Sequence, residues 1–236
     1  MPRLTASERL LEIATVATQD FGRLGYRLTK TADVAAKAGI SAGALFTYVE
    51  SKEALFHLVF LHWFGTPADQ PTVLPVPTPG PGETLALIEA GLRHVQTPLI
   101  RAALAADEPA DVAEELRGIV AERYDLIEHY WPLLAVIERC AAEMPELESA
   151  WFGIARAASY EDLGSYLERR MAAGLLRPMP DSEVAARIVT ELLSWFAWHR
   201  HEGRDSARYD EATVRRTVAE FTCAALVPSA RRADKD

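Results

Sequence analysis

The sequence of 236 residues has only two cysteines, no apolar run that could span a bilayer and no recognisable export signal. A membrane-spanning helix needs about 20 mainly apolar residues in succession. The N-terminal stretch has no uninterrupted apolar segment followed by a small-residue cleavage site, which a secretory signal would require. We therefore expect a cytoplasmic protein without a membrane partner, in which Cys140 and Cys223 are reduced core thiols rather than a disulfide.

The sequence also lacks the short motifs of common enzyme and cofactor sites. It has no Gly-rich phosphate loop, no nucleophile elbow, no HExxH and no paired CxxC. His199 and His201 are two residues apart and point to different sides of a helix, and no cysteine or carboxylate cluster adjoins them. We expect no metal, no cofactor and no enzymatic activity; a helical hydrolase or isomerase using buried carboxylates is the enzyme alternative.

Strand-like alternation is lacking as well, and apolar residues recur at intervals of three and four, which predicts helices. Six prolines lie between Gly65 and Glu83 and predict an extended or mobile linker, since proline neither continues a helix nor donates to a sheet. Within the helical part that follows, we expect a kink at Pro98 and a break into two helices at Pro132.

The net charge of −9 is unevenly distributed. Residues 1–64 hold seven basic and six acidic residues, so the acidity belongs to the rest of the chain. An acidic body repels DNA and leaves the N-terminal part as the surface on which a nucleic acid could bind.

The stretch VAAKAGISAGALFTYVESKEAL, residues 34–55, has the features of a helix-turn-helix. Ala35 is small enough for two helices to cross closely, and Gly39 tolerates the positive φ of a tight turn. Ser41 can cap a recognition helix that ends at Tyr48. The apolar residues that would hold the two helices together are Val34, Ala38, Ile40 and Leu45.

This stretch and the residues before it resemble the N-terminal domain of the tetracycline-repressor (TetR) family of transcriptional regulators. The matching residues are Phe21, Gly25, Tyr26, Thr29, Val34, Ala35, Ala38, Gly39, Ile40, Ser41, Gly43, Leu45, Phe46, Tyr48, Ser51, Lys52, Glu53 and Leu55. The resemblance implies a homodimer that binds a double-stranded DNA operator through two such domains. It also implies a helical body that binds a small effector, usually with release of a palindromic operator and derepression.

The residues expected at the DNA are Arg27, Thr29, Lys30, Ser41, Ala42, Gly43, Ala44, Thr47, Tyr48 and Lys52. Ser41 and Thr47 can donate to phosphate, and Lys52 matches the family's phosphate-binding lysine at a helix N-terminus. Many family members have polar residues where this chain has Ala42, Ala44 and Phe46. We therefore expect fewer phosphate contacts and some apolar readout of bases, or a DNA-binding function that has decayed.

The body is expected to hold an apolar or aromatic effector among wide side chains. The candidate pocket residues are His57, His94, Tyr124, Trp131, Trp151, Phe152 and Trp195, and the candidate dimer-interface residues are Tyr166, Leu167, Leu193 and Phe196. The segment RIVTELLSWFAWHRH favours an interface because it is apolar over more than one face. The resemblance implies a four-helix bundle across the dimer, in which this segment and SYEDLGSYLERRM take part.

The predicted fold class is all-α, with an N-terminal helix-turn-helix three-helix domain and a larger helical domain for ligand binding and dimerisation. The expected ranges are 1–64 for the DNA-binding domain, 65–83 for the linker, 84–228 for the effector and dimerisation domain, and 229–236 for a polar tail. Two other functions remain as alternatives: a dimeric ligand sensor that acts without specific DNA binding, and a transcriptional activator.

Overall fold

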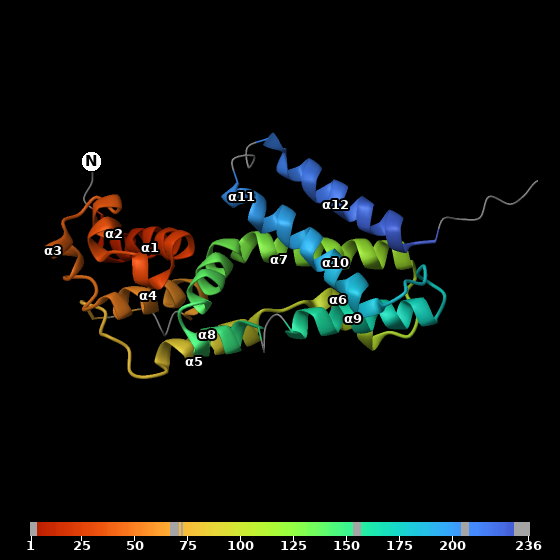
Figure 1. Cartoon of the computed structure of the whole chain (residues 1–236), viewed down its shortest axis with the longest axis horizontal. Coiled ribbons are helices and arrows are strands. Elements are labelled where there is room, and N and C mark those ends of the chain that lie inside the picture. The colour runs from red at the N-terminus through yellow and green to blue at the C-terminus, as the bar shows by residue number, and fades with distance from the viewer. Residues whose placement is uncertain (1–3, 67–70, 72, 153–156, 204–207, 229–236) are drawn as a thin grey trace, which may run out of the picture. The chain divides into compact units, whose positions relative to one another are not determined.

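A computed structural model describes residues 4–66, 71, 73–152, 157–203 and 208–228 (Figure 1). The isolated parallel bridge between Val49 and Val76 is the β structure in these residues, and the prediction of an all-α fold is confirmed. The helices are α1 Ala6–Leu28, α2 Thr31–Lys37, α3 Ala42–Leu45, α4 Lys52–Phe64, α5 Glu83–His94, α6 Pro98–Ala105, α7 Val112–Ala141, α8 Pro145–Ala150, α9 Ala157–Ala172, α10 Ser182–Ser194, the π-helical turn η2 Trp195–His199, α11 Arg200–Glu202 and α12 Glu211–Leu226.

The chain forms two compact units. Unit 1 comprises Met1–Val95 and Pro132–Ala155, and unit 2 comprises Gln96–Trp131 and Arg156–Asp236. The boundary falls inside α7, between Trp131 and Pro132. The compact units therefore cut across the predicted ranges, because α5, α8 and the end of α7 group with the N-terminal helices. The expected tail, 229–236, lies outside the described residues.

Pro98 and Pro132 affect the helices differently from what the sequence predicts. Pro98 begins α6 at its first turn, where its missing N–H has no intrahelical partner to lose, so the predicted kink is wrong. Helix α7 continues through Pro132, so the predicted break is wrong too. The residues that follow Pro132 bury one apolar face, including Leu133, Val136 and Cys140, and this packing outweighs one lost backbone hydrogen bond.

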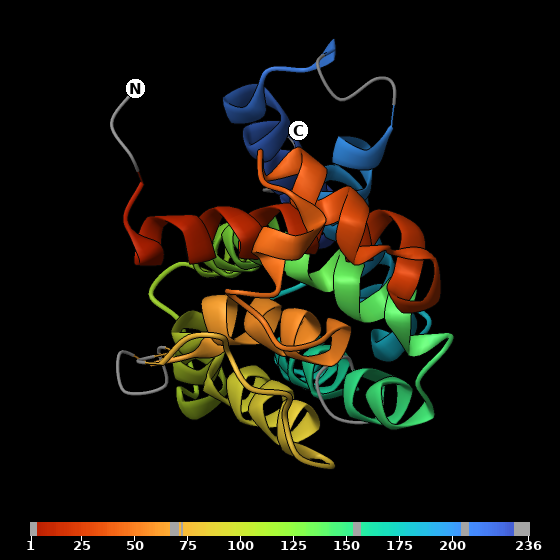
Figure 2. The same cartoon turned by 90° about the vertical axis from the view of Figure 1, so that its left-hand side faces the viewer.

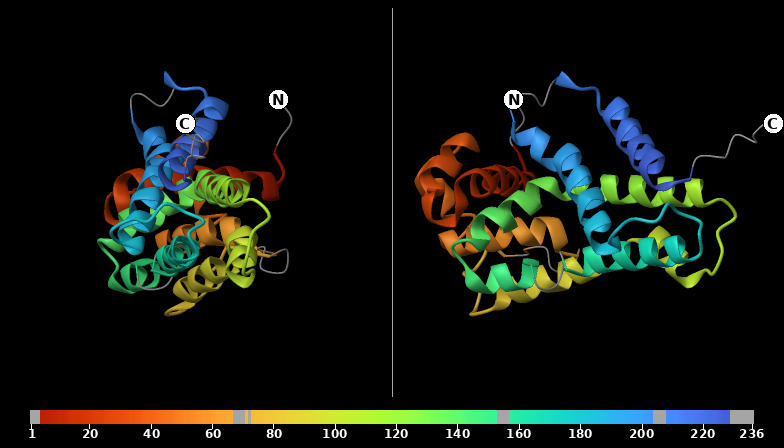
Figure 3. Two further views of the ribbon diagram at one scale, coloured as in Figure 1. Left: turned by 90° about the vertical axis from the view of Figure 1, so that its right-hand side faces the viewer. Right: turned by 45° about the vertical axis from the view of Figure 1, so that its right-hand side comes forward.

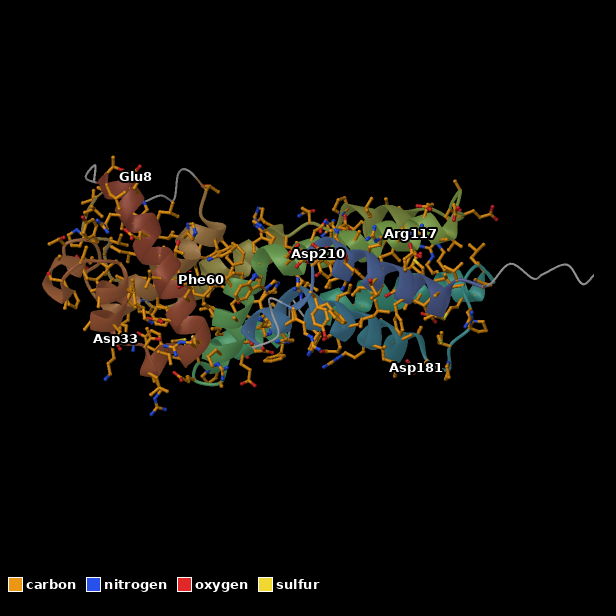
Figure 4. The ribbon with its side chains drawn as sticks, turned by 90° about the horizontal axis from the view of Figure 1, so that it is seen from above. Glu8, Asp33, Phe60, Arg117, Asp181 and Asp210 are labelled. Atoms are coloured by element: carbon orange, nitrogen blue, oxygen red, sulfur yellow. The ribbon has the colours of Figure 1, made fainter. Side chains whose placement is uncertain are left out.

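The first helix starts at a side-chain cap and is interrupted near its end by a glycine. Thr5 and Glu8 form a reciprocal capping box, and Glu8 lies at the N-terminal end of α1 in Figure 4. Gly25 has φ of 82° and interrupts the helical geometry, although three further residues continue α1. A side chain at Gly25 would be strained by this φ and would meet the carboxylate of Glu143, which lies at the turn after α7.

Unit 1 is held together by aromatic packing around α4. Phe21 and Tyr26 of α1 stack with a 5.8 Å centroid separation, and Phe56 meets both rings edge-on. Phe60 continues the cluster one helical turn later, inside unit 1 (Figure 4). Because these rings span α1 and α4, they fix the end of α1 relative to the start of α4, where Lys52 lies.

Unit 2 is a bundle of α6 and the first part of α7 with α9, α10 and α12, which Figure 3 shows from two sides. Asp181 and Asp210 cap the starts of α10 and α12 (Figure 4). Cys223 lies in this core and Cys140 in unit 1, both as free thiols, as predicted. Burial raises the pKa of the Cys140 thiol to about 12, which keeps it protonated.

Candidate nucleic-acid interface

The turn between α2 and α3 has the geometry of a helix-turn-helix (Figures 1 and 2). Gly39 has φ of 69°, as its role in a tight turn requires. The N–H of Ile40 donates to the carbonyl of Ala35 at 3.0 Å and closes the turn. Val34, Ala38 and Leu45 are fully buried, as is the small Ala35, whereas Ile40 is partly buried, so the two helices pack through three of the four predicted apolar residues.

The recognition helix is shorter than predicted. Helix α3 covers Ala42–Leu45, and the predicted segment from Phe46 to Tyr48 continues as a tighter turn. There the N–H of Thr47 donates to Ala44 and that of Tyr48 to Leu45, a three-residue spacing. One consequence is that Thr47 and Tyr48 are displayed from a turn rather than from a helix face.

The N-terminal end of α3 is exposed and polar at its cap. The hydroxyl oxygen of Ser41 accepts a hydrogen bond from the N–H of Ala44 at 3.1 Å, and Ser41, Ala42 and Gly43 are exposed. The Ser41 proton stays available for a phosphate or base. Thr47 differs, because its hydroxyl already donates to the carbonyl of Ala44 at 2.7 Å and must give up that bond to donate to DNA.

Lys52 lies at the first turn of α4, which Ser51 caps by accepting from the N–H of Ala54 at 3.0 Å. Its ammonium lies 4.7 Å from the centre of the Tyr26 ring and donates to the carbonyl of Arg27 at 3.3 Å. A positive charge at a helix N-terminus is a suitable site for a phosphate. The structure thus places Lys52 at the N-terminal end of α4, beside Tyr26 and the last turn of α1.

The structure corrects the role predicted for Thr29. Its side chain is buried, and its single hydroxyl proton is shared between the carbonyl oxygens of Gly25, at 2.7 Å, and Asp20, at 3.1 Å. It therefore closes the end of α1 and does not reach a phosphate or cap α2. Arg27 and Lys30, which flank it, are exposed. The N–H of Arg27 donates to Glu143 at 2.7 Å.

Part of the proline-rich segment is bonded to the turn between α3 and α4. The N–H of Val76 donates to the carbonyl of Tyr48 at 2.7 Å, and the N–H of Glu50 donates to the carbonyl of Val76 at 3.0 Å. We call residues Val76–Thr78 the strap. This part of the predicted linker is therefore extended and bonded to the N-terminal helices; Val76 stands between two prolines and keeps both of its backbone groups for pairing. Residues 67–70 and 72 lie outside the described residues.

The seven predicted pocket residues fall into both units. Unit 1 holds His57, His94, Trp151 and Phe152, and unit 2 holds Tyr124, Trp131 and Trp195. His57 Nδ1 lies 2.9 Å from the Thr84 hydroxyl, and burial lowers the pKa of His57. Trp151 is buried, whereas His94, Phe152 and Trp195 are exposed.

Unit 2 has an open groove of about 550 Å³ between α6 and α7. None of the seven predicted pocket residues lines it. The lining residues are Leu99, Gly118, Ala121, Glu122, Asp125, Leu126, His129 and Tyr130. The sequence does not reveal this groove, because small residues such as Gly118 and Ala121 line part of its wall and Leu99 comes from a different helix.

His201 has carboxylate neighbours, which the sequence analysis did not find. One ligand atom each from Glu128, His201 and Glu211 lies within 4.8 Å of the others, a spacing that could hold a metal ion. These residues come from three separate elements, so no local motif marks them. Glu211 already accepts from Tyr124 at 2.6 Å and pairs with Arg200. That guanidinium disfavours a cation at the same carboxylate.

The four predicted interface residues belong to the core of the protomer. Tyr166, Leu167 and Leu193 are buried in unit 2, and Phe196 packs partly buried against them. Because these side chains pack inside the protomer, the prediction that they meet a partner is wrong; Tyr166 and Leu167 lie on the inward face of α9, and Leu193 lies on the inward one of two apolar faces of α10. The outward face exposes Val184, Ile188 and Trp195, and Phe221 is exposed on neighbouring α12.

No helix within the described ranges is both long and apolar enough to cross a membrane. Residues 13–59 match the family described as bacterial regulatory proteins of the tetR family. Residues 128–224 match the C-terminal domain of AefR-like transcriptional repressors. None of the curated proteins matches the sequence.

Solved structures of TetR-type regulators have a similar fold. The ketosteroid transcriptional regulator KstR2 of Mycobacterium tuberculosis is 16% identical with a TM-score of 0.55, over 97% of this chain and 98% of that one. A tetR-family regulatory protein from Rhodococcus RHA1 is 18% identical with a TM-score of 0.53, over 97% and 100%. AibR, solved with isovaleryl coenzyme A and operator DNA, is 16% identical with a TM-score of 0.50, over 90% and 97%. With family matches at both its N-terminal and its C-terminal part, the chain belongs to the TetR family of bacterial transcriptional regulators.

Proposed function

We propose that the protein is a cytoplasmic, ligand-responsive repressor that binds a palindromic operator as a homodimer and leaves it when a small apolar effector binds. The observation that carries this proposal is the helix-turn-helix with exposed Ser41–Gly43 and with Lys52 at a capped helix N-terminus. The described side chains of this surface offer DNA a hydroxyl, a small apolar surface and a positive charge. No catalytic role is proposed.

Selection of bound duplexes from a random-sequence pool, at physiological salt, tests the proposal. We expect a near-palindromic consensus whose half-sites are about 34–36 Å apart, or a multiple of one helical turn. A folded dimer that enriches no sequence would contradict the proposal and favour the dimeric sensor that acts without specific DNA binding.

We propose a dimer interface on the outward face of α10 and η2, continued by α12. Val184, Ile188 and Trp195 recur at four and seven residues and form one exposed apolar stripe. Phe221 of α12 adds to it, and α10 and α12 are neighbours in unit 2 (Figure 3). An apolar stripe on a second face of a helix that is already packed requires a partner, and a second copy satisfies it symmetrically.

The effector is proposed to be a small apolar or aromatic molecule. Wide buried rings in the body, Tyr124 and Trp151 among them, suit such a ligand. A thermal-shift panel of apolar, cationic and anionic small molecules tests this chemistry. Stabilisation by apolar compounds together with loss of the selected duplex is expected. Stabilisation by cations alone would contradict an apolar effector.

Lys52→Ala is expected to weaken binding of the selected duplex about tenfold, because one charged contact to phosphate is lost. The slope of log K against log salt should fall by about one, and the preferred sequence should not change. Arg93→Ala removes one positive charge from an exposed position on α5 and serves as the control. A changed sequence preference in Lys52→Ala would assign Lys52 to base readout instead.

A further inference from the structure

We propose that the strap, Val76–Thr78, is a working part of the DNA-binding surface, and that Glu50 and Thr78 are positioning residues for it. The proposal rests on the DNA-binding function proposed above. In this account the strap holds the turn between α3 and α4 in the shape that presents Tyr48 and Lys52 to the phosphates. Neither Glu50 nor Thr78 needs to touch DNA.

The backbone of the strap pairs with both sides of this turn. Val76 donates to Tyr48 at 2.7 Å and accepts from Glu50 at 3.0 Å, and its side chain is buried. The turn has no helix of its own between α3 and α4. Without the strap, the carbonyl of Tyr48 and the N–H of Glu50 would have water as their alternative partner, and the turn would lose a fixed geometry.

Thr78 extends this contact to the first turn of α4. Its N–H donates to Glu50 Oε2 at 2.9 Å, and its hydroxyl donates to the Ser51 hydroxyl oxygen at 2.8 Å. The same oxygen of Ser51 caps α4 by accepting from Ala54. The strap therefore reaches the N-cap that directly precedes Lys52. Figure 1 shows the chain after α4 returning to this end of the helix before α5 begins.

Substitution of Glu50 tests the proposal, because the change in DNA affinity should have opposite signs for the two possible roles of its carboxylate. It is an exposed carboxylate two residues from the phosphate-binding Lys52. A negative charge at this place repels DNA, so its removal alone should strengthen binding. If the carboxylate also holds the strap, removal of its acceptor oxygens should weaken binding. Glutamine removes the charge and keeps one acceptor oxygen, whereas alanine removes both.

The experiment measures affinity for the selected duplex at several salt concentrations, together with thermal unfolding. We expect Glu50→Gln to bind as tightly as the wild type or more tightly, and Glu50→Ala to bind about threefold to tenfold more weakly. Thr78→Val should bind about threefold more weakly. Both weaker variants should show a shallower salt slope and an unchanged consensus. Val73→Ala, an exposed residue outside the strap, is the control and should match the wild type.

A merely structural strap would change the unfolding temperature and leave the salt slope of the folded protein unchanged, so the slope separates the two roles. Glu50→Ala binding as tightly as Glu50→Gln would overturn the proposal and make Glu50 a plain surface charge. A wild-type protein that selects no duplex would instead refute the proposed function. The failure of the strap proposal and the failure of the proposed function are distinguishable, because only in the first case does the wild-type protein still bind a selected duplex.

Discussion

Replacing Glu115 with alanine is expected to lower the free energy of unfolding by about 3 kcal/mol, the lower end of the range for breaking a buried ion pair. Arg170 of α9 is 2% exposed and bonds Glu115 through two nitrogens, at 2.9 and 3.0 Å. It also donates to the carbonyls of Ala103, Ala106 and Asp107 at the end of α6. Without Glu115, the buried guanidinium of Arg170 would be bonded only to neutral backbone carbonyls, and its positive charge would have no carboxylate to balance it.

Glu114→Ala is the matched control, because Glu114 is the preceding residue and its side chain is 71% exposed against 17% for Glu115. Its pair with Arg117 is a surface pair, for which we expect about 0.5 kcal/mol. Urea unfolding at one fixed protein concentration compares the two. Equal midpoints would show that Arg170 contributes through its carbonyl bonds and not through Glu115. Replacing both partners, Glu115→Leu with Arg170→Met, should recover most of the loss.

The helix-turn-helix could be predicted because each of its requirements is local. Each requirement selects a particular residue type at a fixed position. The turn needs a positive φ and has Gly39, the close helix crossing needs a small residue and has Ala35, and the helix starts need hydroxyl caps and have Ser41 and Ser51. The capping box at the start of α1 is read in the same way. The same geometry gives the positions of Ser41 at the start of α3 and of the partly exposed Lys52 at the start of α4.

The strap, the proposed dimer face and the His201 cluster could not be predicted in this way. The strap pairs through the backbone N–H and carbonyl of Val76, and such pairing does not require a particular residue type. Both faces of α10 are apolar, so periodicity shows two stripes and does not tell which one is buried: Leu193 lies inside and Ile188 outside. The partners of His201 come from distant helices. Thr29 was a candidate DNA contact, but its side chain is buried and hydrogen-bonds to the backbone at the end of α1.

Replacing Ile188 with aspartate is expected to convert the dimer into monomers and to weaken binding to the palindromic duplex by at least about a hundredfold. Ile188 is 63% exposed at the centre of the apolar stripe on α10. In a twofold interface the same surface occurs on both partners, so one substitution places two carboxylates in the contact. A monomer then binds a single half-site and loses the effective concentration that links the two recognition helices.

Analytical ultracentrifugation and titration of the duplex measure both effects. Phe221→Asp, at a residue 66% exposed on α12, should act in the same way if α10 and α12 share the interface. Leu99→Asp places the same charge at an exposed apolar residue of α6, away from the stripe, and should remain dimeric. Phe196→Asp should instead destabilise the protomer, because Phe196 packs against its core. An intact dimer for Ile188→Asp would move the interface to another face, whereas monomers that keep full affinity would show that the two half-sites are bound independently.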